Sequence, residues 1–327
     1  MTKSTAAIVG AGSLGTAMAK VMADAGNKVR VWAPSDIIAT EINRNHTNRK
    51  YTREVILPTG ITASSDIKTV LTGADYVLLA IPSQFLRTRL RQWHDQFEAG
   101  VAVISLIKGL ESDTGLRMSE IVKDELMLPD EQIAVMSGPN LSQEIALELP
   151  TATIVASSNQ QSAELFCRHS ATAYFFPRPA TDVIGVELCG VIKNIVSLAT
   201  GIVEGRGYGD NARALIVTRG LHEMTALVHA VGGQTETIQD IAGIGDIVVT
   251  SSSGASRNHQ AGKLIGQGIA ATEAVARLGR TVEGIVSAPA LLGLAKRHHI
   301  EVPLFAAIAG IVEGRLSETQ GLAPFLR

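Results

Sequence analysis

A glycine-rich segment near the N-terminus has the residue types that bind a dinucleotide. The run Gly10-Ala11-Gly12-Ser13-Leu14-Gly15 follows a short apolar segment, 6–9, and opens a helical pattern. Gly10 permits a tight turn, Gly12 lets the backbone approach a pyrophosphate, and Gly15 lets the helix pack closely on a sheet. The N-terminus of that helix offers N–H donors to phosphate oxygens. The segment therefore predicts a dinucleotide site; the alternative is a glycine turn that binds no ligand.

The end of the second predicted strand normally distinguishes NAD from NADP. An acidic residue there binds the ribose 2′-OH of NAD, whereas an Arg accommodates the 2′-phosphate of NADP. In this chain the strand ends in Trp32-Ala33-Pro34-Ser35, which contains neither residue type. We therefore expect NAD or NADP to bind, with a preference of less than about tenfold between them.

Lys193 is a charged residue in an apolar stretch, between Val191-Ile192 and Ile195-Val196. A charge in such a helix is costly unless it is paired or used. Glu187 lies six residues earlier, which places it about 240° away around the helix, so it is a poor ion-pair partner for Lys193 on the same helix. We expect Lys193 to meet an acid from elsewhere or to face a cleft, where apolar surroundings lower its pKa towards that of a general acid. A structural lysine is the alternative.

Polar residues also follow two of the predicted strands. Lys108-Gly109 closes the apolar run 101–107, and Ser137-Gly138-Pro139-Asn140 closes the run 133–136. In an open α/β sheet, ligands bind outside the carboxyl ends of the strands. Lys108 is therefore well placed to reach a substrate, although a solvated or structural lysine is the alternative.

Two more polar segments lie in the second half of the chain. Asp246 follows Gly243-Ile244-Gly245 on a predicted glycine turn, where it either caps the next element or pairs with Lys193. Ser256-Arg257-Asn258 precedes a predicted helix. A hydroxyl, a guanidinium and an amide at a helix N-terminus form a good anion site. Ordinary capping beside a solvated Arg is the alternative.

The pattern of elements distributes these residues over two domains. Strands are predicted at 6–9, 29–32, 76–81, 101–107, 133–136, 152–155 and 174–176, with helices between them, including one at 83–97 capped by Ser83. This alternation predicts βαβ units and a mostly parallel sheet. Later segments predict only helices, at 182–203, 211–231, 260–266, 272–278, 284–298 and 303–314. We predict an α/β fold: a Rossmann-like dinucleotide-binding domain over 1–180, then an all-helical substrate-binding and catalytic domain over 181–327.

Composition excludes several classes of protein. The chain has 327 residues, of which 46% are hydrophobic and 18% charged, and this excludes a disordered chain. The net charge of −2 argues against a protein that coats nucleic acid or an anionic membrane surface. Two Cys residues fit a reducing compartment. The most apolar long stretch contains Glu187 and Lys193, which argues against a membrane span. With no targeting segment visible, we expect a cytoplasmic protein.

Taken together, the motifs resemble those of the bacterial-type NAD(P)-dependent glycerol-3-phosphate dehydrogenases over nearly the whole chain. The resemblance rests on the segments 10–15, 81–83, 108–109, 137–139, 191–194, 205–212, 218–221, 243–246, 256–258 and 283–284. It implies reduction of dihydroxyacetone phosphate to sn-glycerol 3-phosphate for glycerophospholipid synthesis, with the active site in a cleft between the two domains. It also implies a homodimer and no metal ion.

The resemblance implies a role for each matched residue. Lys193 matches the catalytic lysine and Lys108 a second lysine that contacts the substrate, and we add Asp246 to this catalytic set. The implied substrate pocket contains Lys108, Gly138, Asn140, Lys193, Asp246, Ser256, Arg257 and Asn258. The implied cofactor contacts are Gly10, Gly12, Ser13, Leu14, Gly15, Pro34, Lys108, Ser142, Arg257, Thr281 and Glu283.

Four positions depart from the family pattern. Leu14 stands where an aromatic residue is common, Asn140 and Ser142 replace a small hydroxyl and an Ala, and Pro34 replaces a basic residue. Two alternatives remain: a ketopantoate reductase-like or hydroxyacid dehydrogenase, and a regulator that binds NAD(P)H without turnover. The predicted anion site at 256–258 favours a phosphorylated substrate, and the presence of Lys193 and Asp246 argues against a regulator.

Overall fold

The chain folds into two compact units that share the sequence unequally. The structure is a computed structural model that describes residues 4–254 and 256–326. One unit comprises Met1–Ile107 and Met118–Val183, and the other comprises Lys108–Arg117 and Ile184–Arg327. The chain therefore passes from one unit to the other three times. The ten-residue segment Lys108–Arg117 belongs to the second unit although it lies within the first half of the sequence.

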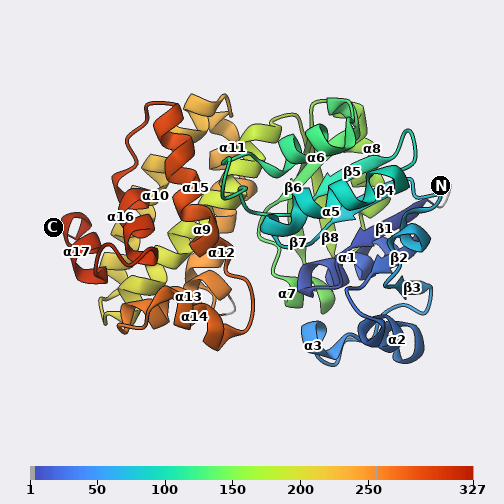
Figure 1. Ribbon diagram of the computed structural model, residues 1–327, viewed down its shortest axis with the longest axis horizontal. Helices are drawn as coiled ribbons and strands as arrows, with labels where there is room; N and C mark the ends of the chain where they lie inside the picture. The colour runs from blue at the N-terminus through green and yellow to red at the C-terminus, as the bar shows by residue number, and fades with distance from the viewer. Residues whose placement is uncertain (1–3, 255, 327) are drawn as a thin grey trace. The chain divides into compact units, whose positions relative to one another are not determined.

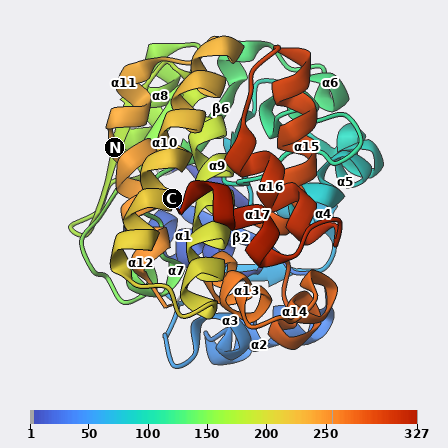
Figure 2. The same cartoon turned by 90° about the vertical axis from the view of Figure 1, so that its left-hand side faces the viewer.

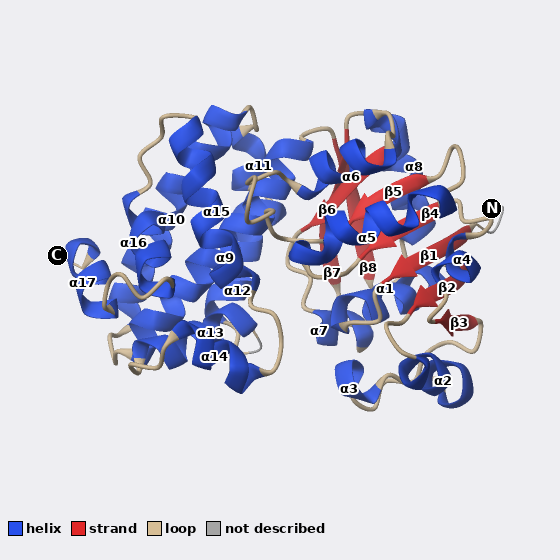
Figure 3. Cartoon of the chain, in the orientation of Figure 1, coloured by secondary structure: helices blue, strands red, loops and turns tan. Residues whose placement is uncertain are grey.

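The first unit is built on one eight-stranded sheet with the order β3-β2-β1-β4-β5-β6-β7-β8 (Figures 1 and 3). Its strands are β1 (Thr5–Val9), β2 (Lys28–Trp32), β3 (Ile61–Ser64), β4 (Tyr76–Leu79), β5 (Ala102–Ser105), β6 (Ile133–Ser137), β7 (Thr151–Ser157) and β8 (Phe175–Ala180). Neighbouring strands are parallel except for β6 and β7. The central strands are continuous apolar runs because both faces of such a sheet are covered. The predicted Rossmann-like, mostly parallel sheet is confirmed.

The helices of this unit are α1 (Ser13–Asp24), α2 (Asp36–Asn45), α3 (Arg49–Thr52), α4 (Ile67–Leu71), α5 (Leu86–Trp93), α6 (Met118–Leu126), α7 (Ser142–Ala146) and α8 (Gln160–Ser170). The predicted helical segment over 83–97 is present, but the prediction that Ser83 caps it is wrong. Pro82 precedes a 3₁₀ turn, Ser83–Phe85, and the α-helix begins only at Leu86. Strands β4 and β5 are shorter than predicted: Ile81 and Ile107 are buried although they lie in the loops after the strands, so the apolar runs extend beyond the strands.

The second unit contains α9 (Val183–Gly205), α10 (Asp210–Val231), α11 (Thr235–Gln239), α12 (Asp246–Ser252), α13 (Arg257–Gly266), α14 (Ala271–Leu278), α15 (Glu283–Arg297), α16 (Pro303–Val312) and α17 (Glu318–Leu322). No named strand lies in its described residues, as predicted. Helix α9 continues past its predicted end at 203, because Gly205 packs against the backbone of α13 at Lys263 instead of ending the helix. Asp246 is not on a glycine turn: a π-helical turn, Ile241–Gly245, leads directly into α12.

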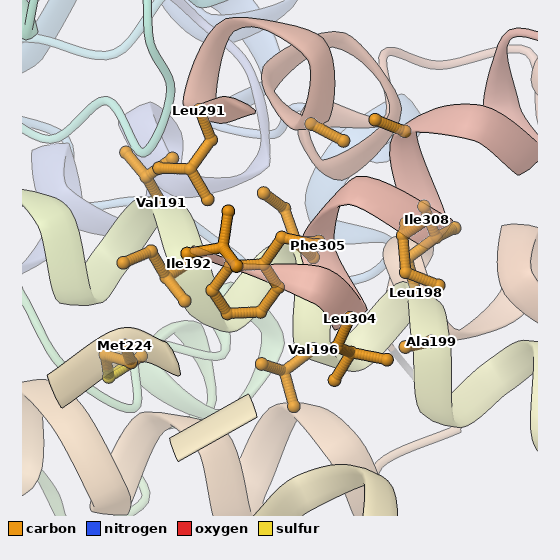
Figure 4. Packing of buried hydrophobic residues seen from close by; sticks show 14 of the residues in the cluster. Val191, Ile192, Val196, Leu198, Ala199, Met224, Leu291, Leu304, Phe305 and Ile308 are labelled. Carbon is orange, nitrogen blue, oxygen red and sulfur yellow. The ribbon is translucent and has the colours of Figure 1, made fainter. Parts of the chain in front are cut away.

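Helix α9 forms the core of the helical unit. Figure 2 shows it between α10 on one side and α15 and α16 on the other. Side chains from these helices, including Ile192, Met224, Leu291 and Phe305, pack in one buried cluster (Figure 4). Helix α9 is long and apolar enough to cross a membrane by length and composition, but 83% of its most apolar window is buried inside the protein. Burial in this core accounts for its apolar sequence.

Candidate active site

Two lysines, an aspartate and a threonine meet on the helical unit. Lys193 Nζ lies 3.1 Å from Asp246 Oδ1 and donates to Thr250 Oγ1 at 2.9 Å. Lys108 Nζ donates to Asp246 Oδ2 at 2.5 Å. The side chains of Lys193, Lys108 and Asp246 are only 11%, 13% and 2% exposed. We call these four residues the lysine–aspartate cluster.

Helix geometry explains why two members of the lysine–aspartate cluster, Asp246 and Thr250, lie side by side. Asp246 and Thr250 are one turn apart on α12, and residues at this spacing are neighbours on a helix surface. Thr250 donates its single hydroxyl proton to Asp246 Oδ1 at 3.0 Å, so its oxygen accepts from Lys193. Lys193 thus uses two of its three ammonium protons within the cluster. The third has no acceptor among the residues that the structure describes.

Two members of the lysine–aspartate cluster, Lys193 and Asp246, have lowered pKa values. Burial lowers the pKa of Lys193 to about 8; Asp246 opposes this effect, and the charges of Lys108 and Arg257 add to it. Burial alone would raise the pKa of Asp246, but the charges of Lys108 and Lys193 outweigh burial and hold that pKa below its usual value. At neutral pH the cluster therefore holds two positive charges and one negative charge, with a proton on Lys193 that is easily released.

A chain of amide hydrogen bonds fixes the backbone beside the lysine–aspartate cluster. Asn194 Nδ2 donates to Lys108 O at 3.1 Å, and Asn194 Oδ1 accepts from Asn258 Nδ2 at 2.8 Å. Asn258 Oδ1 in turn accepts from Gly284 N at 2.9 Å. The side chain of Asn258 thus links α9, α13 and α15. Asn194 and Thr250 were missed as site residues; the four-residue spacing from Asp246 was the one signal for Thr250.

The remaining predicted residues of the helical unit lie at the starts of α13 and α15. Ser256 is the N-cap of α13: its buried Oγ accepts from His259 N at 3.3 Å and lies 3.0 Å from Ser197 Oγ. Arg257 is exposed and donates to Thr281 O at 3.0 Å. Glu283 is the first residue of α15. Arg257 thus ties the N-terminal end of α13 to the segment that leads into α15.

The α/β unit contains a loop with the shape of a dinucleotide cradle. Gly10 has φ +123°, and a Cβ there would lie 2.6 Å from Ala80 O; a Cβ on Gly15 would lie 1.9 Å from Gly10 O. Gly12 is the N-cap of α1, and a Cβ on it would meet no described atom within 4 Å. Two glycines are therefore required by close packing, and the third keeps the N-terminus of α1 open, which fits a bound pyrophosphate. Ser13 and Leu14 are the first residues of α1.

The other predicted residues of the α/β unit lie at the same edge of its sheet. Gly138 (φ +150°) and Asn140 follow β6, Ser142 begins α7, and Pro34 is exposed after β2. Asn140 Nδ2 donates to Thr153 Oγ1 at 3.0 Å. Strands β1, β2 and β6 run parallel to one another, so the carboxyl ends of β2 and β6 lie at the same edge of the sheet as the glycine loop that follows β1. That edge is where α/β sheets bind ligands.

One residue that supports the glycine loop was missed. Asn48 is fully buried and donates from Nδ2 to Ala11 O at 2.9 Å and to Thr16 Oγ1 at 2.8 Å. It lies beyond β2 in the sequence, so no local pattern connects it to the loop.

For metals, the described residues contain no group of three or more His, Cys, Asp or Glu side chains that could hold an ion.

Sequence comparison identifies relatives along nearly the whole chain. The N-terminal and C-terminal regions of the NAD-dependent glycerol-3-phosphate dehydrogenase family match residues 5–163 and 182–323. A glycerol-3-phosphate dehydrogenase [NAD(P)+] of Thermobifida fusca is 41% identical over 321 residues, which cover 98% of this chain and 96% of the relative.

Structural comparison gives the same result. The crystal structure of glycerol-3-phosphate dehydrogenase from Coxiella burnetii superposes with a TM-score of 0.94 at 36% identity, covering 99% of both chains. A 2-dehydropantoate 2-reductase from Geobacter metallireducens has a TM-score of 0.64 at 16% identity, covering 95% of this chain and all of that one, and so shares the fold alone. The chain belongs to the NAD-dependent glycerol-3-phosphate dehydrogenase family.

Proposed function

We propose that this chain reduces dihydroxyacetone phosphate to sn-glycerol 3-phosphate with NADH or NADPH. The observation that carries the proposal is the lysine–aspartate cluster, a buried acid–base group in a chain whose relatives are named for this reaction. A regulator that only senses NAD(P)H has no need of a buried lysine, because burying its charge is costly even beside a partner acid, whereas proton transfer gives such a lysine a use.

Lys193 is the general acid in this proposal. Its third ammonium proton goes to the carbonyl oxygen of the substrate as that oxygen gains negative charge. Asp246 and Thr250 occupy the other two protons and so fix the direction of transfer. Lys108 keeps a positive charge beside the new alkoxide, which stabilises the transition state. After transfer, Lys193 is neutral and the remaining pair, Lys108 and Asp246, is balanced in charge.

Substrate and cofactor are held by different parts of the chain. Arg257 and the N-terminus of α13 would bind the substrate phosphate. Gly138 and Asn140 keep their predicted role as substrate contacts. Gly10, Gly12 and Gly15 would hold the cofactor pyrophosphate, and Ser13, Leu14, Pro34, Ser142, Thr281 and Glu283 would complete its contacts. When bound, the reduced nicotinamide supplies the hydride. We also propose a cytoplasmic homodimer that supplies glycerophospholipid synthesis.

The proposal is tested by following cofactor oxidation after adding dihydroxyacetone phosphate or ketopantoate to separate samples of the full chain. We expect turnover with dihydroxyacetone phosphate and little with ketopantoate, which lacks a phosphate for Arg257. Turnover with ketopantoate alone would favour the reductase alternative. Cofactor binding without turnover of either substrate would favour the regulator.

A further inference from the structure

The segment Lys108–Arg117 forms a small hairpin that belongs to the helical unit. We call it the arm. Leu110 and Arg117 form an antiparallel bridge, and Glu111 N donates to Leu116 O at 3.0 Å. Gly115, with φ +68°, makes the return possible. Leu110 is fully buried in the core of the helical unit. The arm is thus an ordered element of the unit that carries the lysine–aspartate cluster.

Polar contacts fix the arm at both ends. At its start, Lys108 binds Asp246, and Leu110 N donates to Ser287 Oγ at 3.3 Å. At its end, Arg117 Nη1 lies 3.0 Å from Glu187 Oε2. The side chains of Arg117 and Glu187 are only 13% and 3% exposed. The second anchor is therefore a buried ion pair.

A buried ion pair is weak evidence for stability, because desolvating both charges costs as much as their attraction returns. Its best-attested use is to fix the register of one element against another. The hairpin transmits that register here, because Arg117 is bridged to Leu110, two residues beyond Lys108. Glu187 lies on α9, the helix that also carries Lys193. One helix thus holds both the proposed acid and the residue that anchors the arm.

We propose that Arg117 and Glu187 are a positioning pair, which sets the register of the arm so that Lys108 Nζ meets Asp246. This inference rests on the proposed function, because Lys108 affects turnover only if the lysine–aspartate cluster performs the reduction. Neither Arg117 nor Glu187 is placed to touch the substrate in this account. Their effect on the reaction passes through Lys108.

The test uses the double variant Arg117→Met/Glu187→Met in the full chain. Removing both partners of this ion pair together costs less than removing one of them, so this variant is expected to fold. Loss of register should lower kcat for dihydroxyacetone phosphate about ten- to a hundredfold, as small misplacements of catalytic groups do. Cofactor Kd should change much less than kcat, because Lys108 is one of many predicted cofactor contacts and the glycine loop keeps its structure. Arg117→Lys keeps the positive charge but loses the planar guanidinium group, so it should give a smaller loss of kcat.

Two readouts separate positioning from a merely structural role. Lys193 faces Asp246, Lys108 and Arg257, and withdrawal of Lys108 removes a repulsion that lowers the pKa of Lys193. The alkaline limb of the rate profile should therefore move to higher pH in both variants. Hydrogen exchange at Leu110 N, which donates to Ser287, should also accelerate relative to amides of α10.

Glu223→Gln is the matched control. Glu223 is a buried carboxylate on α10 that accepts from Leu304 N and Phe305 N, at 2.7 and 3.0 Å. This variant should lower Tm without moving the rate profile. The positioning role would be overturned if the folded charge variants had the same kcat, the same pH–rate profile and the same Leu110 exchange rate as the wild type. An inactive wild-type chain would instead refute the proposed function, and Leu110 exchange would still decide whether the pair sets the register.

Discussion

At the scale of single residues, the pKa of Lys193 is set by opposing effects. Burial lowers it to about 8, Lys108 and Arg257 act in the same direction, and Asp246 acts against them. A general acid must be protonated, so kcat/KM for reduction should be constant below pH 8 and fall as pH rises through that value. A pH profile measured with saturating cofactor checks this. A rate that stays flat through pH 10 would exclude Lys193 as the acid.

Replacing Lys108 should shift this profile in a known direction. Lys108→Ala removes a positive charge that lowers the pKa of Lys193, so the alkaline limb should move to higher pH while the maximal rate falls. Lys123→Ala is the control, because Lys123 is 52% exposed and pairs with Asp130 in the α/β unit. A limb that moves equally in both variants would show that the shift reflects net charge rather than contact within the lysine–aspartate cluster.

Arg257 is the residue most directly responsible for the phosphate in this account. A charge-assisted hydrogen bond to phosphate contributes roughly 1.5–3 kcal/mol, and the exposure of Arg257 places the effect at the lower end. Arg257→Ala should therefore raise KM for dihydroxyacetone phosphate about tenfold, with a much smaller effect on an analogue without phosphate. Equal losses for both compounds would contradict the phosphate role.

Pro34 occupies the position that normally governs the choice of cofactor. It is exposed at the end of β2, where neither an acid nor an Arg is present to select the ribose 2′ substituent. Wild-type kcat/KM for NADH and NADPH should differ by less than about tenfold, and Pro34→Arg should favour NADPH by roughly one to two powers of ten. A wild-type preference of about a hundredfold or more would reveal a discriminating residue elsewhere.

Residue-scale prediction from sequence succeeded where a pattern was local. The isolated charge of Lys193 predicted either a partner acid from elsewhere or a cleft, and the structure supplies Asp246 as the acid. The choice for Asp246 between capping and pairing with Lys193 stayed open, because the two residues lie on different helices, α9 and α12, and only tertiary packing joins them. Asn48 was missed for the same reason: its contact with Ala11 depends on the fold beyond β2.

At the scale of elements, glycines bring α9 and α13 into backbone contact. A Cβ on Gly201 would lie 2.2 Å from His259 O, and a Cβ on Gly262 would lie 2.1 Å from Leu198 O. Helix propensity alone disfavours these glycines, so close packing accounts for them. This contact sets the position of α13, whose N-terminus carries Ser256 and Arg257. It also explains why α9 extends to Gly205, where the sequence pattern predicted an earlier end.

Substituting these glycines gives an element-scale prediction. Gly201→Ala should lower the free energy of unfolding by about 1–3 kcal/mol, because the helices cannot separate without losing core contacts. Gly293→Ala is the matched control: Gly293 lies within α15 with no neighbour within 4 Å of its added Cβ, so alanine should stabilise by roughly 0.5–1 kcal/mol. Urea unfolding of both variants measures this. A Gly201→Ala variant as stable as wild type would show that the helix contact is loose.

At the scale of the whole molecule, the proposed acid–base chemistry is assembled within one unit. Lys193, Asp246 and Thr250 come from the helical half of the sequence, and Lys108 reaches them on the arm. The alternation of strands and helices predicted the sheet, and the change of pattern near residue 180 predicted the helices. The arm was not predictable, because hairpin 108–117 follows β5 in sequence and joins the other unit through Leu110 and Arg117.

The most direct test of the central claim is kcat for dihydroxyacetone phosphate reduction by Lys193→Ala, measured beside cofactor Kd. General acid–base groups contribute about 10²–10⁴-fold, so kcat should fall by that factor. Cofactor Kd should stay close to wild type, because the glycine loop lies in the other unit and keeps its structure. A variant that turns over at nearly the wild-type rate across the pH range would contradict the account, because the lysine–aspartate cluster would then have no part in the reaction.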